Sequence, residues 1–270
     1  MNLISDNSKD AFSAGKTKKD KVRIQSVSQV HEFFGMGKPK HPLISVLPIT
    51  DEMTNFNYGD ATYLFDLYQI SLKKGIKGSI TYGRNDYDFQ EGTMVFTKPD
   101  QSLRIETGEN YQGSSGWTIV FHPDLIRKSE LGQVIDQYSF FSYEVNEALH
   151  LSDDEQKTLT ELVEKIEKEY CQVIDRHSQE LIISNLKLLL DYCTRYYDRQ
   201  FYTRTNLNQD FVTQFESLLK AYYTSDKPLE LGVPTVKYCG EEMHMSSHYL
   251  SDLLRKETGR GAQDHIFLSD

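Results

Sequence analysis

The chain has 270 residues, enough for two domains of ordinary size, and 38% of them are hydrophobic, which is typical of a water-soluble globular protein. No apolar run approaches the roughly 18 residues that suggest a membrane span, so no membrane partner is expected. The net charge of −10 argues against broad nucleic-acid affinity, because nonspecific binding to phosphates needs a basic face. It leaves room for a small DNA-reading module joined to an acidic domain.

Residues 1–40 are expected to form a disordered or loosely packed tail. From Met1 to about Lys21 the chain is polar and rich in lysine, and it lacks the apolar stretch of a secretory signal. The three cysteines, Cys171, Cys193 and Cys239, lie far apart in apolar, helical-looking segments. They favour reduced core thiols and a cytoplasmic location.

Residues 41–150 show the pattern of short strands separated by turns. In one run Tyr68, Ile70 and Leu72 alternate with polar residues, and a later run alternates from Trp117 to Phe121. Glycine and proline interrupt the runs at close spacing. The pattern predicts a β-sandwich or a small barrel.

Residues 151–204 change to helical spacing. Ser152 and Glu155 form a capping box that opens one helix, and a second helix is predicted over residues 178–199. The second helix has a broad apolar side that includes Leu186 and Leu189. Such a helix either packs on its own barrel or pairs with its copy in a dimer.

Residues 205–270 are predicted to be all helical. After a helix over residues 208–223, a short helix is expected over residues 235–243, and Ser246 is a good N-cap for a further helix that runs to residue 257. Gly259 follows at the position where a left-handed residue ends a helix. Two short helices joined by a turn of a few residues follow the helix-turn-helix plan.

Residues 236–259 resemble the first helix-turn-helix of the AraC/XylS family of transcription regulators. The match includes the turn glycine, the N-cap serine, a core leucine and the terminating glycine in register: Gly240, Ser246, Leu250 and Gly259. Upstream, Asp88-Phe89-Gln90-Glu91-Gly92 and Phe140-Phe141-Ser142-Tyr143 resemble the family's cupin-like half, and Tyr197-Asp198-Arg199-Gln200-Phe201 resembles its connector. The resemblance implies an α+β protein: a cupin-like β-barrel sensor, a helical dimerisation and connector region, and a partial helix-turn-helix domain. It also favours a homodimer, with Leu186 and Leu189 at the contact.

The second helix of this motif is where base contacts are expected. With Tyr249, Leu250, Leu253 and Leu254 facing inward, the outward positions include those at which the family reads bases or contacts phosphates. The resemblance assigns base reading to His248, Ser251 and Asp252, and phosphate contacts to Arg255 and Lys256. The alternative is that these are solvated surface residues, above all Asp252, because phosphates repel a carboxylate.

The barrel is expected to hold no metal or other cofactor, and no enzymatic activity is expected. Metal-binding cupins need several imidazoles, and no histidine occurs between His41 and His122. His244 and His248 have the spacing of helical ligands, but a turn separates them. An aromatic-lined cavity would suit a sugar or another small organic effector, with Tyr68, Tyr82 and Trp117 as candidate lining. Side chains alone also commonly fill small barrels.

We therefore expect an effector-controlled, sequence-specific DNA-binding regulator. The segment after Gly259 resembles the start of the family's linker helix, and the second helix-turn-helix does not follow. Residues 229–270 contain four basic and seven acidic residues, a net charge of −3, so binding to double-stranded DNA is expected to be weak. The alternative is a dimerising protein-interaction module without productive DNA binding. A non-metal cupin enzyme is a third possibility, for which we find no nucleophile or acid–base pair.

Overall fold

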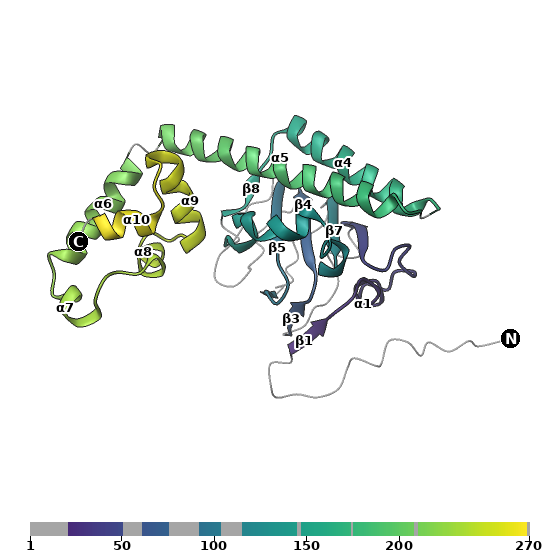
Figure 1. The fold of residues 1–270 in the computed structure, drawn as a ribbon, viewed down its shortest axis with the longest axis horizontal. Helices are drawn as coiled ribbons and strands as arrows, with labels where there is room; N and C mark the ends of the chain where they lie inside the picture. Colours follow the sequence, from purple (N-terminus) through teal and green to yellow (C-terminus); the bar gives the residue numbers. More distant parts are fainter. Residues whose placement is uncertain are drawn as a thin grey trace.

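The computed structural model describes residues 21–50, 61–75, 92–103, 115–144, 147–173, 175–207 and 210–268. It is a mixed α/β protein in which an antiparallel sheet precedes a helical C-terminal region (Figure 1). None of the helices in this part of the chain has both the length and the apolar character that crossing a membrane requires.

The first half of the chain supplies the strands and short helices. In chain order these are β1 (Lys21–Ile24), α1 (Val27–Phe33), β2 (Ile44–Pro48), β3 (Thr62–Phe65), β4 (Tyr68–Lys74), β5 (Thr93–Thr97), β6 (Ser102–Leu103), β7 (Ser115–Phe121), η1 (Pro123–Leu125), α3 (Glu130–Val134), η2 (Ile135–Gln137), η3 (Ser139–Ser142) and β8 (Leu149–His150). We call residues 21–150 the sheet region.

The second half is helical. It contains α4 (Asp153–Cys171), α5 (Ser178–Leu207), α6 (Asp210–Tyr223), α7 (Lys227–Leu231), α8 (Val236–Glu242), α9 (Ser247–Thr258) and α10 (Ala262–Leu268). We call α6 to α10 the C-terminal helices. They gather beyond the end of α5 that leaves the sheet (Figure 1).

The larger sheet has two faces of different character. Its strand order is β2-β7-β4-β5-β8, and every pair is antiparallel. Because side chains alternate along a strand, Ile70 and Leu72 join the core beneath the helices, whereas Gln69 and Ser71 lie on the opposite face. Leu47 and Val120 on that opposite face pack against a second, smaller sheet.

The smaller sheet corrects the prediction for the N-terminal tail. Its order is β1-β3-β6, with β1 parallel to β3, and Val27 and Val30 of α1 are buried in its core. The expectation of a loosely packed tail is therefore wrong for residues 21–33, while residues 1–20 lie outside the described residues. Sequence reasoning missed this segment because four residues of strand and one short helix give little periodicity.

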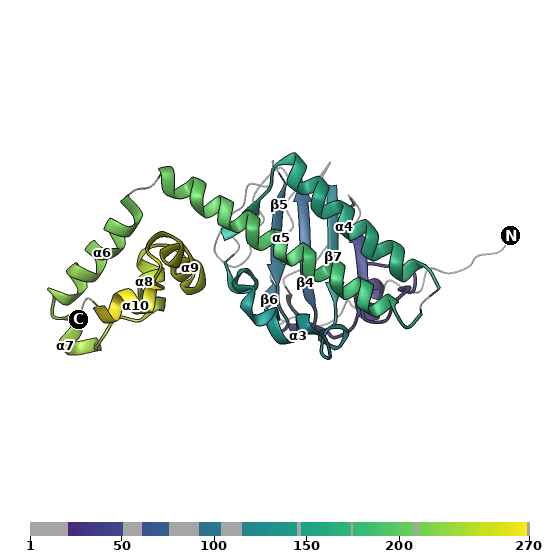
Figure 2. The same ribbon diagram turned by 45° about the horizontal axis from the view of Figure 1, so that its top comes forward.

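Helices α4 and α5 cross the helix-facing side of the larger sheet, as Figure 2 shows. The capping box of α4 is confirmed: the Ser152 hydroxyl accepts from the Glu155 N–H, and the Glu155 carboxylate accepts from the Ser152 N–H. Helix α5 ends at Leu207 rather than at residue 199, because no glycine or proline interrupts the segment between.

The apolar side of α5 is used within the chain. Leu186 and Leu189 are fully buried against α4 and the sheet, so they have no surface left with which to contact a second copy. Among the α5 side chains that the structure describes, Leu181 and Leu188 are half-exposed, at 47% and 44%, and Tyr202 near the end of the helix is exposed. Cys193 and Cys239 are buried as predicted, whereas Cys171 at the end of α4 is exposed.

Candidate functional site

Helices α8 and α9 form a compact pair, and local sequence fixes the ends of both. The Thr235 hydroxyl caps α8 by accepting from the Tyr238 N–H, and the Ser246 hydroxyl caps α9 by accepting from the Tyr249 N–H. Gly259 ends α9 with φ 78°, a left-handed conformation that suits a residue without Cβ. Leu250 is fully buried beneath the pair.

The turn between the two helices leaves no room for a side chain at Gly240. A Cβ at this position would lie 2.6 Å from the carbonyl oxygen of Met245. His244 in the same turn has φ 56°, an uncommon conformation for a residue with a side chain. Gly240 therefore sets how closely the turn approaches α8.

Only some of the residues that were predicted to contact DNA from the outward side of α9 are exposed to solvent. His248, Arg255 and Lys256 are exposed. Ser251 instead faces α10, where its hydroxyl oxygen accepts from the Ala262 N–H at 3.2 Å. The expectation that Ser251 projects outward is wrong, because the chain returns after Gly259 and covers that side of the helix.

The Asp252 side chain also has hydrogen-bond partners within the protein. Its carboxylate accepts from the Tyr143 hydroxyl at 2.8 Å and from Arg255 Nη1 at 2.8 Å. Burial, and then the charge of Asp252, raise the pKa of the Tyr143 phenol, which keeps the hydroxyl protonated as a donor. Tyr143 directly follows η3, so this bond joins α9 to the sheet region.

A buried carboxylate, Glu147, makes short polar contacts between the sheet region and the C-terminal helices. Glu147 accepts from the Ser246 N–H at 2.5 Å and from the Ser246 hydroxyl at 2.6 Å, and it also accepts from the Glu144 N–H at 2.7 Å. Burial raises the pKa of Glu147, and the hydrogen bonds from Ser246 oppose this shift. Sequence reasoning missed Glu147, since nothing local indicates that a residue 99 positions before the N-cap reaches it.

Five consecutive residues of α5, residues 197–201, connect these parts. Tyr197 donates to the carbonyl oxygen of Glu147 at 3.1 Å, Asp198 pairs with Lys256 of α9 at 2.7 Å, and the ring of Phe201 packs against that of Tyr249. The two residues between them, Arg199 and Gln200, contact β8 and the start of α4.

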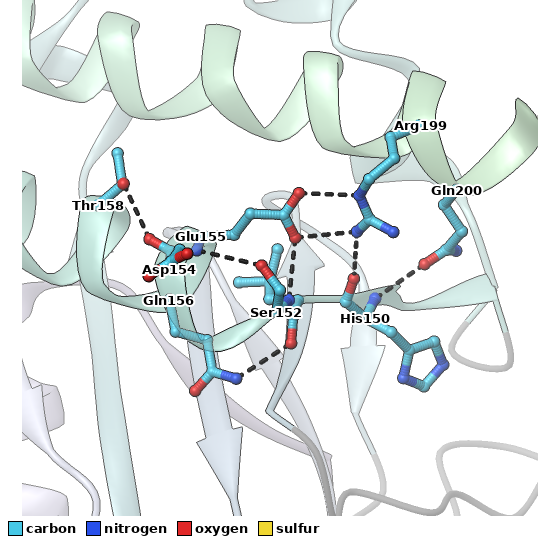
Figure 3. A network of polar contacts seen from close by, with 9 residues as sticks. His150, Ser152, Asp154, Glu155, Gln156, Thr158, Arg199 and Gln200 are labelled. Carbon is cyan, nitrogen blue, oxygen red and sulfur yellow. Dashed lines mark hydrogen bonds and ion pairs between the residues drawn. The ribbon is translucent and has the colours of Figure 1, made fainter. Parts of the chain in front are cut away.

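Figure 3 shows this junction of β8, α4 and α5. Arg199 donates from Nε and Nη2 to the two oxygens of Glu155, at 2.8 and 3.0 Å, and from Nη2 to the His150 carbonyl oxygen at 2.7 Å. Gln200 accepts from the His150 N–H at 2.9 Å. It also donates to the Ala148 carbonyl oxygen at 3.1 Å. One short segment of α5 thus contacts β8, α4 and α9.

The inner face of the larger sheet, which faces the smaller sheet, carries buried polar groups. Gln69 Nε2, Thr93 Oγ1 and Thr97 Oγ1 are buried and find no hydrogen-bond partner among the described residues. Gln69 and Thr97 lie opposite each other on β4 and β5, so two of these groups are neighbours. The polar alternation was visible in the sequence, but its burial under a second sheet was not.

The predicted lining residues do not occupy this face. Tyr68 stacks on Phe121 in the core beneath the helices, and Trp117 Nε1 donates to Thr160 Oγ1 of α4 at 3.1 Å. Both therefore point to the helix-facing side, which corrects their assignment to an interior cavity. Tyr82 lies outside the described residues.

Within the described ranges, no group of three or more His, Cys, Asp or Glu side chains is placed to hold a metal ion. His122 caps η1 by accepting from the Asp124 N–H, and His244 and His248 lie on either side of the N-cap of α9.

Comparison with known proteins gives no further assignment. The chain matches no protein-family model, and the search of curated proteins finds no significant relative.

Proposed function

We propose that this chain is a sequence-specific DNA-binding regulator of the AraC/XylS type, with α8 and α9 as its helix-turn-helix. The observation that carries the proposal is the geometry of the pair. Helix α9 is capped at both ends, seated on a buried apolar face and joined to α8 by a turn that only glycine fits at Gly240. Helix pairs of this design place the second helix in the major groove.

In this proposal α9 is the reading helix, and its roles follow from its exposed side. His248 near the start of α9 contacts base edges, and Arg255 and Lys256 contact phosphates. Asp252 reads a base only after it leaves Tyr143, and Ser251 supports α10 rather than reading DNA. The base-reading set is thus narrower than the sequence suggested.

The charge of the region limits the affinity. Residues 229–270 have a net charge of −3, so counterion release adds little and nonspecific binding is weak. Base contacts and the pairing of two copies must then supply much of the discrimination. We propose a homodimer that uses the exposed side of α5, where Leu181 and Leu188 lie two turns apart.

The effector of this regulator binds, in our proposal, at the inner face of the larger sheet, which forms part of a cupin-like barrel. Gln69, Thr93 and Thr97 direct polar groups into that interior without partners among the described residues. Buried polar groups are normally hydrogen-bonded, so a small polar molecule such as a sugar would complete them. In this proposal the sensor binds its effector without a cofactor and without transforming it.

The test is selection of bound sequences from random double-stranded DNA at one fixed salt concentration. We expect one enriched motif. Replacing Arg255 by alanine should weaken binding to all sequences and lower the slope of log affinity against log salt by about 1, whereas replacing His248 should relax the preference at one position.

Arg195→Ala is the matched control, because this exposed arginine lies on α5, outside the proposed helix-turn-helix. Loss of binding in the control equal to that of Arg255→Ala would place the DNA contact elsewhere. Failure to enrich any sequence with the wild-type chain would favour a dimerising interaction module.

A further inference from the structure

The polar groups on the inner face of the larger sheet fall into two sets. Toward β2 and β7 they are paired. The Ser45 hydroxyl is bonded to His31 Nε2 at 2.9 Å, and the Thr118 hydroxyl is bonded to that of Ser71 at 2.9 Å. The buried polar atoms that find no partner among the described residues of this face lie on β4 and β5: Gln69 Nε2, Thr93 Oγ1 and Thr97 Oγ1. A bound molecule would therefore be satisfied on the β4 and β5 side.

One cross-strand row on that side combines a buried hydroxyl with two basic side chains. Lys73 on β4 lies opposite Thr93 on β5, and Thr93 lies opposite His150 on β8. Residues directly opposite each other on antiparallel strands share a face of the sheet. Figure 3 shows the His150 ring pointing away from α5, which covers the other face. Lys73 and His150 thus flank the fully buried Thr93.

From this row we infer that the effector is an acid, a polyhydroxylated molecule whose carboxylate binds at Lys73, Thr93 and His150. The inference deepens the effector site of the proposed function and rests on it. A carboxylate only accepts hydrogen bonds, and an ammonium, a hydroxyl and an imidazole N–H can each donate one. Bonds to an ionised acceptor are also the stronger ones. A neutral sugar would leave the lysine charge of this row unused.

The charge distribution makes the row the favoured place for an anion. The chain has a net charge of −10, so the protein as a whole repels an acid. On the described strands of the larger sheet, no acidic residue occupies an inner-face position, whereas Lys73 and His150 do. The attraction for a carboxylate is therefore local to this row.

A second row marks the far end of the site and gives the effector its length. Gln69 lies opposite Thr97, which follows Thr93 by four residues along β5. Four residues of an antiparallel strand span about 13 Å. One sugar ring is shorter than this span, and two linked rings match it. The Gln69 amide can donate to sugar oxygens, and the Thr97 hydroxyl can donate or accept. The effector that fits both rows is an acidic disaccharide.

The test is calorimetric titration of the full chain with disaccharides of hexuronic acids in the gluco, galacto and manno configurations. Each acid is compared with its neutral counterpart, in which the carboxylates are reduced to primary alcohols. We expect at least one acid to bind about tenfold more tightly than its counterpart, with a difference that shrinks as salt is raised. Equal affinities, tighter binding of the neutral sugars, or no binding of any acid would overturn the inference.

Variants then locate the carboxylate. Lys73→Met should weaken binding of the acid about tenfold and leave its neutral counterpart unchanged. Lys74→Met is the matched control, because the next residue of β4 lies opposite Ser115 with its side chain on the other face. Thr97→Val should weaken both sugars alike. Circular dichroism checks that each variant is folded. Equal losses in the two lysine variants would contradict the assignment of the carboxylate to this row.

The titration involves no DNA, so its outcome is separate from that of the sequence selection. Acid-selective binding by a chain that enriches no DNA motif would reject the proposed regulator and keep the acidic effector. A DNA motif enriched by a chain that binds no acidic disaccharide would keep the regulator and overturn this inference.

Discussion

At the scale of single residues, the contact between Glu147 and Ser246 is expected to depend on pH. Burial raises the pKa of the Glu147 carboxyl in the folded protein, the hydrogen bonds from Ser246 oppose this shift, and the neighbouring charge of Glu144 adds to it. A raised acid pKa favours the protonated form, so the packing of α9 against Glu147 is expected to be strongest below the ordinary glutamate value and to weaken as pH rises through the raised one. Protection of the Ser246 amide should fall across that interval, and Glu147→Gln should remove the dependence. A protection factor that increases with pH would contradict the sign.

Gly240 gives a second prediction at this scale. In Gly240→Ala the new methyl group meets the Met245 carbonyl oxygen, so the turn must open, at a cost of about 1–3 kcal/mol in the free energy of unfolding. Gly37→Ala is the control, because a Cβ there has no neighbour within 4 Å. Urea unfolding followed through the C-terminal helices distinguishes them. Equal stability of the two variants would show that the turn is not tightly closed.

Thr97 tests the inner face of the sheet. Its hydroxyl finds no partner among the described residues, whereas the Thr118 hydroxyl bonds Ser71 at 2.9 Å. Thr97→Val should leave the unfolding free energy of the effector-free protein unchanged or slightly higher, while Thr118→Val should lower it by about 1 kcal/mol. A larger loss in Thr97→Val than in Thr118→Val would mean that the Thr97 hydroxyl is already satisfied.

At the scale of elements, local sequence predicted the helices well where capping residues were present. Ser152, Ser246 and Gly259 begin or end helices at the expected positions, because a cap acts over three or four residues. The end of α5 was misplaced because no such residue marks it. The burial of Leu186 and Leu189 could be predicted only as an alternative, since an apolar side of a helix does not say which partner covers it.

The junction formed by α5 depends on paired hydrogen bonds from one guanidinium. Arg199→Lys keeps the positive charge but loses the bidentate hydrogen bonds to the Glu155 carboxylate and the hydrogen bond to the His150 carbonyl oxygen. We expect a loss of about 1 kcal/mol in the free energy of unfolding. Arg195→Lys, on the exposed side of the same helix, should change it little. The two variants unfolding at the same urea concentration would argue against the junction as a source of stability.

At the scale of the whole molecule, the sequence was least informative about which distant parts meet. The alternation in β4 predicted a strand with one polar face, but not that a second sheet would bury this face. Likewise the helical pattern of residues 246–257 predicted an exposed side, but not that Tyr143 and Asp198 would engage it. Such contacts join residues that lie far apart in the chain, which local periodicity does not encode.

The proposed dimer is tested on the outward side of α5. Changing both Leu181 and Leu188 to glutamate places charges on exposed positions, so the chain should stay folded and sediment as a monomer at a concentration where the wild type is dimeric. Changing Leu186 and Leu189 instead puts two carboxylates into the core against α4 and the sheet, which should unfold the chain rather than only dissociate it. Circular dichroism of each variant separates loss of fold from loss of association.

Because effective concentration at two half-sites depends on pairing, the folded monomer should also bind DNA more weakly than the wild type. A wild-type chain that sediments as a monomer throughout, or an exposed-side variant that remains dimeric, would exclude this side of α5 as the contact.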